Sequence, residues 1–267
     1  MEWYEALILG LLQGLTEFLP VSSSGHLEIG QELFGVSGDG NLLFDITVHV
    51  ATVLSTIVVL WKPLWEIIRS CCSTWAWNEG KVYAAKIVVS MIPVFIVGVF
   101  FKDVVEEFFG NGILLVGICL WVTAALLAFA HFARPRERED ISYLHALVIG
   151  LAQAVAVLPG LSRSGSTIAT GLLLGNKKET VAQFSFLMVL VPVLGEALLE
   201  GLKVAKEPAL VADGLGWTAL AVGFVAAFAA GCLACRFMLE IVRRQKLIWF
   251  ALYCVLVGTF AIVWSFC

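Results

Sequence analysis

Long apolar runs constrain this chain most, because several of them approach the length of about 20 residues that a helix needs to cross a bilayer. The chain has 267 residues, of which 60% are hydrophobic and only 14% charged, whereas soluble domains carry about 25% charged residues. The runs do not alternate polar and apolar residues as the strands of a membrane barrel do. The sequence therefore predicts an all-α polytopic membrane protein.

Six runs are long and unbroken enough to be spanning helices, and they lie near 42–60, 82–101, 113–132, 180–200, 217–237 and 248–266. Two further apolar segments, 4–35 and 144–175, are each interrupted by a stretch rich in proline, serine and glycine. Irregular backbone at membrane depth is tolerated only where it is buried in protein or lines a water-filled cavity. We therefore expect two re-entrant helical hairpins beside six transmembrane helices.

The positions of lysine and arginine predict the orientation, since such residues favour the cytoplasmic side. If both hairpins are re-entrant, thirteen of the seventeen basic residues fall on one side: Lys62, Arg69, Lys81, Lys86, Arg134, Arg136, Arg138, Lys177, Lys178, Arg236, Arg243, Arg244 and Lys246. Only Lys102, Lys203 and Lys206 fall on the other side, and Arg163 lies inside the second interrupted segment. This asymmetry predicts that both termini are outside. A charge buried at the depth of Arg163 is expected to be functional or paired.

The two interrupted segments resemble each other when the chain is shifted by 140 residues. Thirty aligned positions then hold ten identities, including a glutamine, a Ser-x-Ser-Gly motif and several spaced glycines. We interpret this as an internal repeat within a single membrane domain over 1–267, with repeat 1 over about 1–135 and repeat 2 over about 140–267. One hairpin and three spanning helices per repeat imply an inverted topology, in which the two hairpin tips meet near the midplane.

The first segment carries Gln13 and Glu17, which are four residues apart and so share one face of a helix. Gly10 and Gly14 leave room beside them for another backbone. A hydrogen bond to a neighbouring helix explains Gln13 as well as a functional role does. A buried carboxylate needs a proton, a cation or a metal, so a functional role is favoured for Glu17.

Pro20 ends this helix, and three serines, a glycine and His26 follow it. One serine is explained as the N-cap of the next helix. A loop of Ser and Gly that opens a helix is also a good anion site, so Ser22, Ser24 and Gly25 are candidate phosphate-binding residues. His26 can exchange a proton near neutral pH, although a lone histidine in a membrane is more often a hydrogen-bonding residue.

The second segment repeats this pattern with Ser162, Arg163, Ser164 and Gly165, and its guanidinium suits bidentate phosphate binding. Together the two segments predict a phosphoryl-transfer site, at which a serine attacks, a histidine shuttles a proton and Glu17 binds a divalent cation. A site of this kind within a membrane protein implies a lipid phosphate as substrate. Asp45 and His49 are four residues apart and either pair with each other or support this site.

Two stretches carry a resemblance to a known family. "QGLTEFLPVSSSGHL" and "PGLSRSGST" resemble, in order and spacing, the two signature motifs of the BacA-type undecaprenyl-diphosphate phosphatases, the bacitracin-resistance family. The resemblance implies a phosphoric anhydride hydrolase of the bacterial cell membrane, with its site open to the periplasmic or outer side. It would convert undecaprenyl diphosphate to undecaprenyl phosphate and inorganic phosphate, and so recycle the lipid carrier for cell-wall synthesis. A divalent cation, Mg²⁺ or Ca²⁺, is implied as cofactor.

By the same resemblance, Glu17 is the essential acid, Ser23 the nucleophile, His26 the essential histidine and Arg163 the residue that binds the diphosphate. Gln13 stands where some members of the family have a second glutamate. A neutral amide is a weaker metal ligand, so a site with two carboxylates is not expected here. Gln13 either binds the metal beside Glu17 or only orients water or phosphate. A rival mechanism makes His26 the nucleophile.

Two other classes compete with this interpretation. A transporter or flippase of lipid phosphates would use the same inverted repeat and the same site. The second known type of membrane lipid phosphatase needs a histidine after its Ser-Arg, and none of His26, His49, His131 and His145 follows Arg163. The expected partners are undecaprenyl diphosphate and membrane lipid, with no nucleic acid, and a homo-oligomer is compatible with the sequence.

Overall fold

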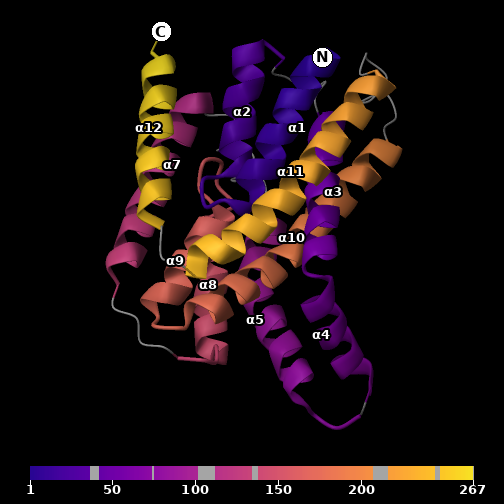
Figure 1. Cartoon of the computed structure of the whole chain (residues 1–267), viewed down its shortest axis with the longest axis vertical. Helices are drawn as coiled ribbons and strands as arrows, with labels where there is room; N and C mark the ends of the chain where they lie inside the picture. Colours follow the sequence, from indigo (N-terminus) through magenta and orange to yellow (C-terminus); the bar gives the residue numbers. More distant parts are fainter. Residues whose placement is uncertain are drawn as a thin grey trace.

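The computed structural model describes residues 1–36, 42–73, 75–101, 112–133, 138–206, 216–243 and 247–266. In these ranges the chain forms eleven helices and no strand (Figure 1). The helices are α1 Trp3–Phe18, α2 Ser23–Phe34, α3 Leu42–Val59, α4 Trp61–Ser73, α5 Glu79–Phe100, α7 Gly112–Phe132, α8 Tyr143–Val155, α9 Arg163–Leu173, α10 Lys178–Lys206, α11 Trp217–Arg243 and α12 Leu247–Trp264. The all-α prediction is confirmed.

Six of these helices, α3, α5, α7, α10, α11 and α12, are long and apolar enough to cross a membrane. They match the six predicted runs, with α5 beginning at Glu79 rather than 82, α10 continuing to Lys206 rather than ending at 200, and α11 continuing to Arg243 rather than ending at 237. The short helix α4 was not predicted. Five basic residues used to predict the orientation lie outside the described residues: Lys102, Arg134, Arg136, Arg244 and Lys246.

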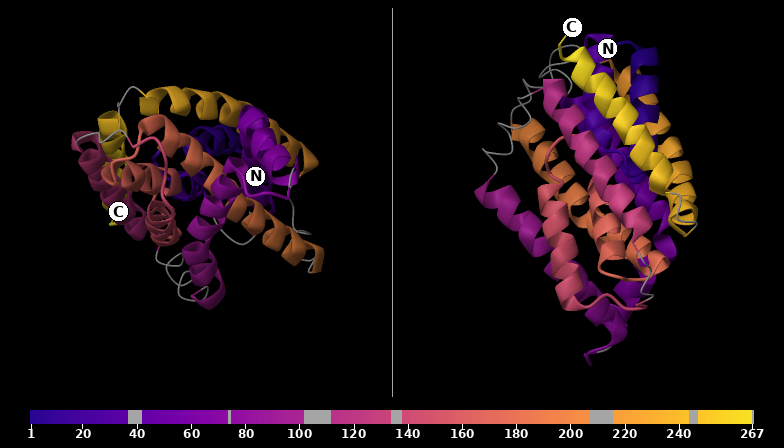
Figure 2. Two further views of the ribbon diagram at one scale, coloured as in Figure 1. Left: turned by 90° about the horizontal axis from the view of Figure 1, so that it is seen from below. Right: turned by 90° about the vertical axis from the view of Figure 1, so that its left-hand side faces the viewer.

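Each interrupted segment forms a pair of short antiparallel helices. α1 and α2 have 16 and 12 residues, and α8 and α9 have 13 and 11, so none reaches the length of about 20 residues needed to span a bilayer. α1 and α2 lie toward the end that holds both termini, whereas α8 starts at the opposite end (Figures 1 and 2). That each pair returns to its own side of a membrane stays a prediction.

Close helix packing holds the first pair in place. α1 packs on α11, and a Cβ atom at Gly10 would lie only 2.5 Å from the carbonyl oxygen of Gly223. Gly14 leaves no more room, because its Cβ would collide with Ala227 O and lie 2.8 Å from Ala230 Cβ. The expected close backbone approach at both glycines is confirmed.

The second pair is fixed by α5 and by polar contacts at its start. Gly150 of α8 lies against the carbonyl of Ser90, so a Cβ there would overlap α5. Buried Lys86 of α5 donates to both carboxylate oxygens of Asp140, at 2.7 and 2.8 Å. Gly10 and Gly150 are equivalent under the 140-residue shift, and each packs against a spanning helix. The proposed repeat boundary near 135–140 falls partly on 134–137, outside the described residues.

The largest cluster of buried apolar side chains surrounds the breaks in the two short pairs. It draws on α1, α3, α7, α9, α10 and α12, with Phe18, Val53, Leu120, Ile168, Phe186 and Cys254 among its members. The segments that join α1 to α2 and α8 to α9 therefore lie in the interior of the bundle, where irregular backbone is protected from lipid.

Candidate functional site

The two helix breaks touch each other. Ser164 Oγ, at the start of α9, donates to the main-chain oxygen of Leu19 at 3.3 Å. A Cβ at Gly25 would lie only 3.0 Å from Gly160 Cα, so the backbones of the two breaks approach each other closely at this glycine. The structure thus brings together two serine-rich motifs that lie 140 residues apart in the sequence.

The serine motifs begin helices α2 and α9 in the same way. Ser22 Oγ accepts from the main-chain N–H of Gly25 at 3.4 Å, and Ser162 Oγ accepts from Gly165 N–H at 3.0 Å. Both serines are therefore N-caps, as predicted for one serine of the first motif. Ser22 is also the one described residue other than glycine with positive φ, at 69°, a strained conformation of the kind that gathers at functional sites.

A polar pocket lies between the two N-termini, and its walls are Thr16, Glu17, Ser22, Ser23, Ser24, Leu161, Ser162, Arg163, Ser164 and Val189. Unpaired N–H groups and the helix dipole make each helix N-terminus attractive to an anion. Here two such ends and one guanidinium face the same space. The arrangement suits a ligand with several phosphate oxygens.

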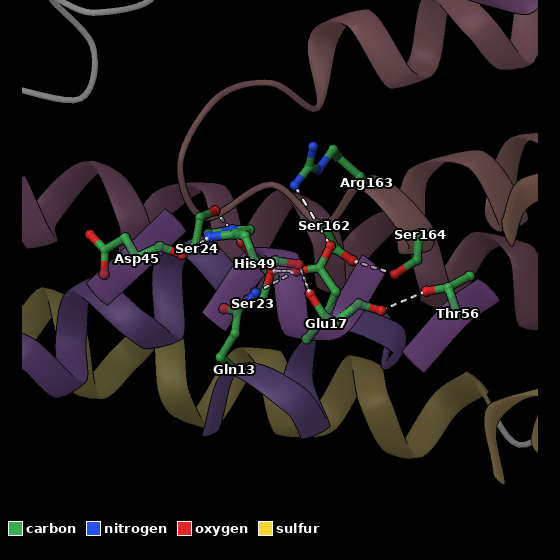
Figure 3. A network of polar contacts seen from close by, with 12 residues as sticks. Gln13, Glu17, Ser23, Ser24, Asp45, His49, Thr56, Ser162, Arg163 and Ser164 are labelled. Carbon is green, nitrogen blue, oxygen red and sulfur yellow. Dashed lines mark hydrogen bonds and ion pairs between the residues drawn. The ribbon is translucent and has the colours of Figure 1, made fainter. Parts of the chain in front are cut away.

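Glu17 joins the two motifs (Figure 3). Ser23 Oγ donates to Glu17 Oε2 at 2.5 Å, and Gln13 Nε2 donates to the same oxygen at 2.9 Å. Arg163 Nη2 lies 3.7 Å from Glu17 Oε1, which makes an ion pair across the two hairpins. The predicted nucleophile, acid and phosphate-binding residue therefore form one connected group.

The Gln13 side chain offers an oxygen for a cation. It is fully buried, and its Oε1 has no hydrogen-bond partner although its Nε2 is bound to Glu17. A buried amide oxygen without a partner requires an explanation such as water or an ion, and hard divalent cations prefer carboxylate and amide oxygens. No cluster of three His, Cys, Asp or Glu side chains suited to a metal occurs in the described parts of the chain. A cation here would rely on Gln13, Glu17 and ligand oxygens.

The structure does not bring His26 to Ser23. His26 Nδ1 donates to the main-chain oxygen of Ser22 at 2.8 Å, and its Nε2 is bound to the hydroxyl of Tyr253 at 2.9 Å. The two rings are stacked, with centroids 5.5 Å apart. In this arrangement Glu17, and not His26, contacts the Ser23 hydroxyl.

His49 belongs to the site more closely than the sequence indicated. It is one of the residues of the polar network that also contains Glu17, Ser23 and Arg163 (Figure 3). Its Nδ1 donates to the main-chain oxygen of Asp45 at 2.8 Å, while the carboxylate of Asp45 accepts from Gln31 at 2.7 Å.

Two residues that sequence reasoning missed hold the motifs in position. Thr123 of α7 is buried, and its hydroxyl accepts from Ser162 N–H at 3.1 Å and donates to Gly160 O at 3.4 Å. Tyr253 of α12 holds His26. In the sequence, Thr123 and Tyr253 stand out only as polar residues within apolar runs, and such a position does not show which residue each one contacts.

A second, apolar pocket adjoins the polar one and shares Glu17, Ser164 and Val189 with it. Its other walls are Phe18, Thr52, Val53, Thr56, Phe186, Leu190 and Val193, from α1, α3 and α10. Charged and apolar surfaces thus meet at one carboxylate, an arrangement that fits an amphiphile with an anionic head.

Comparisons with known proteins show the family of this chain. The family model described as "Bacitracin resistance protein BacA" matches residues 6–260. The undecaprenyl-diphosphatase of Bacteroides fragilis is 60% identical over 265 residues, with 99% of each chain covered. Proteins of the same name from Parabacteroides distasonis and Christiangramia forsetii are 59% identical over 258 residues and 45% identical over 271 residues. These alignments cover 97% and 100% of this chain, and 96% and 99% of the relatives. The chain therefore belongs to the BacA family of bacitracin resistance proteins.

Proposed function

We propose that this chain hydrolyses undecaprenyl diphosphate to undecaprenyl phosphate and inorganic phosphate in a bacterial cell membrane. The observation that carries the proposal is the junction of the polar and apolar pockets at Glu17. Relatives up to 60% identical carry the name of that phosphatase. They give no support to the alternative of a lipid-phosphate transporter.

The substrate's charge matches the polar pocket. Arg163 and the N-terminal N–H groups of α2 and α9 would bind the oxygens of the diphosphate, since guanidinium and helix N-termini both favour phosphate. Ser22, Ser24, Ser162 and Ser164 add hydroxyl groups around the same space. The apolar pocket between α1, α3 and α10 would receive the first part of the prenyl chain.

The nucleophile would be Ser23. Its Oγ attacks the terminal phosphorus, the bond from that phosphorus to the bridging oxygen breaks, and undecaprenyl phosphate leaves. Glu17 Oε2 is placed to take the Ser23 proton, because it already accepts that hydroxyl at 2.5 Å. Glu17 passes the Ser23 proton to the departing undecaprenyl phosphate and is ionised again. Water then attacks the phosphoserine, the bond from phosphorus to Oγ breaks, and Glu17 takes a proton from the water and gives it to Ser23 Oγ.

Glu17 and Gln13 are the residues that would hold a divalent cation, Mg²⁺ or Ca²⁺. The unpartnered Gln13 Oε1 beside a buried carboxylate fits such an ion. When bound, the cation would neutralise charge on the phosphate oxygens. Without it, Arg163 remains the fixed positive charge next to Glu17.

For orientation we propose that both termini and the opening of the site face the periplasmic or outer side. Two arguments support this orientation: the excess of basic residues on one side of the predicted topology, and the position of both termini at the opposite end of the bundle (Figure 1). A homo-oligomer stays a prediction from the sequence.

Phosphate release tests the activity. The purified protein in detergent, with Mg²⁺ or Ca²⁺, should release inorganic phosphate from undecaprenyl diphosphate, and a series of shorter prenyl diphosphates would measure how much the tail contributes. Absence of release, or full activity in Arg163→Ala, would refute the proposal.

Trapping identifies the nucleophile. Rapid quenching followed by mass spectrometry should find the phosphoryl group on Ser23, and this signal should vanish in Ser23→Ala. A phosphoryl group on His26 would establish the rival mechanism, with the Tyr253 contact broken during turnover.

A further inference from the structure

A helical hairpin outside the candidate site projects from the bundle. It consists of α4 and the first part of α5, and it extends beyond the other helices at the end opposite the termini (Figure 1). Asn78 stabilises its turn: its side chain donates to Ser70 O at 2.7 Å and accepts from the main-chain N–H of Lys81 at 3.0 Å, as the N-cap of α5. Specific hydrogen bonds therefore hold the two helices of the hairpin together.

α4 presents three distinct faces. Leu64 and Ile67 are partly buried on the side that packs against the bundle. A second face carries the polar residues Lys62, Glu66, Arg69 and Ser73, with spacings of four, three and four residues. The third face is exposed yet apolar, and it comprises Trp61, Trp65, Ile68 and Cys72 with the same spacing. The Trp61 and Trp65 rings stack on this face, with centroids 5.8 Å apart.

The exposed apolar face continues a stripe that begins on a spanning helix. Leu54 and Val58 of α3 are 41% and 54% exposed, and they precede Trp61 at spacings of four and three residues. Leu60 N–H donates to Thr56 O at 2.8 Å at the end of α3, and Leu64 N–H donates to Leu60 O at 3.0 Å at the start of α4. Only Leu60 separates the two helices, so the exposed apolar face of α4 directly follows the exposed face of α3 along the chain.

We propose that the stripe Trp61–Trp65–Ile68–Cys72 binds the bilayer, so that α4 anchors the hairpin in the leaflet at the end opposite the termini. On α3 the stripe faces lipid, because α3 is long and apolar enough to span a membrane, and α4 carries the same surface onward. Tryptophan is enriched where a membrane meets water, and amphipathic helices lie there with their apolar face in the acyl boundary. Lys62 and Arg69 flank the stripe, where their charges reach anionic headgroups.

Adjacent residues on the apolar and polar faces provide the test. Single-cysteine variants carry an environment-sensitive fluorophore at 68, 69, 72 or 73, obtained from Ile68→Cys, Arg69→Cys, native Cys72 and Ser73→Cys, with the other cysteines replaced by serine. Val58→Cys serves as the reference for a lipid-facing position. Each protein is placed in nanodiscs of phosphatidylethanolamine and phosphatidylglycerol with doxyl-labelled lipid, and its phosphate release is measured to confirm folding.

Positions 68 and 72 should show blue-shifted emission and strong quenching by the doxyl lipid, close to position 58, while 69 and 73 should not. Water-like emission without quenching at all four positions would overturn the proposal. A blue shift at 68 and 72 without lipid quenching, joined by Cys72–Cys72 cross-linking, would overturn it in favour of a second copy of the chain as the occupant.

Discussion

Ser23 Oγ donates a hydrogen bond of 2.5 Å to Glu17 Oε2, whereas His26, one helical turn further on, is bound to Tyr253 at 2.9 Å. From the sequence we expected the histidine to shuttle the proton, but in the structure the Glu17 carboxylate is the group in contact with the Ser23 hydroxyl. The same carboxylate lies 3.7 Å from Arg163. Glu17 thus connects the candidate nucleophile Ser23 with the phosphate-binding residue Arg163.

Glu17→Gln should abolish most of the phosphatase activity. The change keeps the shape of the side chain but removes the proton acceptor, which is typically worth about 10²–10⁴-fold in rate, and it also removes the charge that pairs with Arg163. Initial rates of phosphate release measure the effect. Glu32→Gln, at an exposed position of α2, is the control and should retain wild-type rates; equal activity in both variants would contradict the role of Glu17.

Tyr253→Phe should lower activity only modestly. It removes one hydrogen bond to His26, and such bonds contribute about 0.5–1.5 kcal/mol, or roughly two- to ten-fold. Rates are compared with Tyr4→Phe at an exposed position of α1. A loss as large as that of Glu17→Gln would place the His26–Tyr253 pair within the proton transfer.

Arg163→Lys should raise KM and lower kcat. Lysine keeps the positive charge but loses the planar fork that binds two phosphate oxygens at once, and we expect a fall of about ten-fold or more in kcat/KM, since charged hydrogen bonds contribute about 1.5–3 kcal/mol. The matched control, Arg236→Lys on an exposed part of α11, should leave both constants unchanged. Unaltered kinetics in Arg163→Lys would show that charge alone suffices.

Gln13→Leu should weaken cation binding, because it removes an unpartnered buried oxygen beside Glu17. Mn²⁺ titration followed by electron paramagnetic resonance reports binding separately from turnover. Gln153→Leu is the matched control, since Gln153 is equally buried, also has an unpartnered Oε1 and occupies the equivalent position in the second segment. Identical Mn²⁺ affinity in the two variants would exclude Gln13 as a ligand, whereas Gln13→Glu should bind Mn²⁺ more tightly than the wild type.

Gly10→Ala should destabilise the protein by about 1–3 kcal/mol, the usual range for overpacking, because its Cβ would lie 2.5 Å from Gly223 O. Gly98→Ala in α5 is the control, since a Cβ there meets no atom within 4 Å and alanine favours the helix by about 0.5–1 kcal/mol. Thermal unfolding in detergent should show a lower midpoint for the first variant and an unchanged or higher one for the second. Equal midpoints would mean that α1 can move away from α11.

The spanning helices were predictable because the length and hydropathy of each apolar run are enough to identify it as a membrane-spanning helix. The breaks at Pro20 and Pro159 were equally visible, since proline and a Ser/Gly stretch end a helix whatever surrounds it. Helix α4 was missed because its apolar residues occupy only one exposed face and one packed face of thirteen residues. Such a segment has no long hydrophobic run.

Composition and spacing by themselves determined the membrane class, the six spans, the two interrupted segments and the candidates Glu17 and Arg163, because length, hydropathy and helix breaking act within a few turns of chain. The choice of Ser23 among the three serines came from the family resemblance. Only the tertiary structure decided that the two motifs touch, and that Glu17 rather than His26 contacts Ser23. It also decided that Thr123 and Tyr253 hold the motifs from α7 and α12. These are contacts between residues far apart in the sequence, and side-chain direction there depends on how the helices pack.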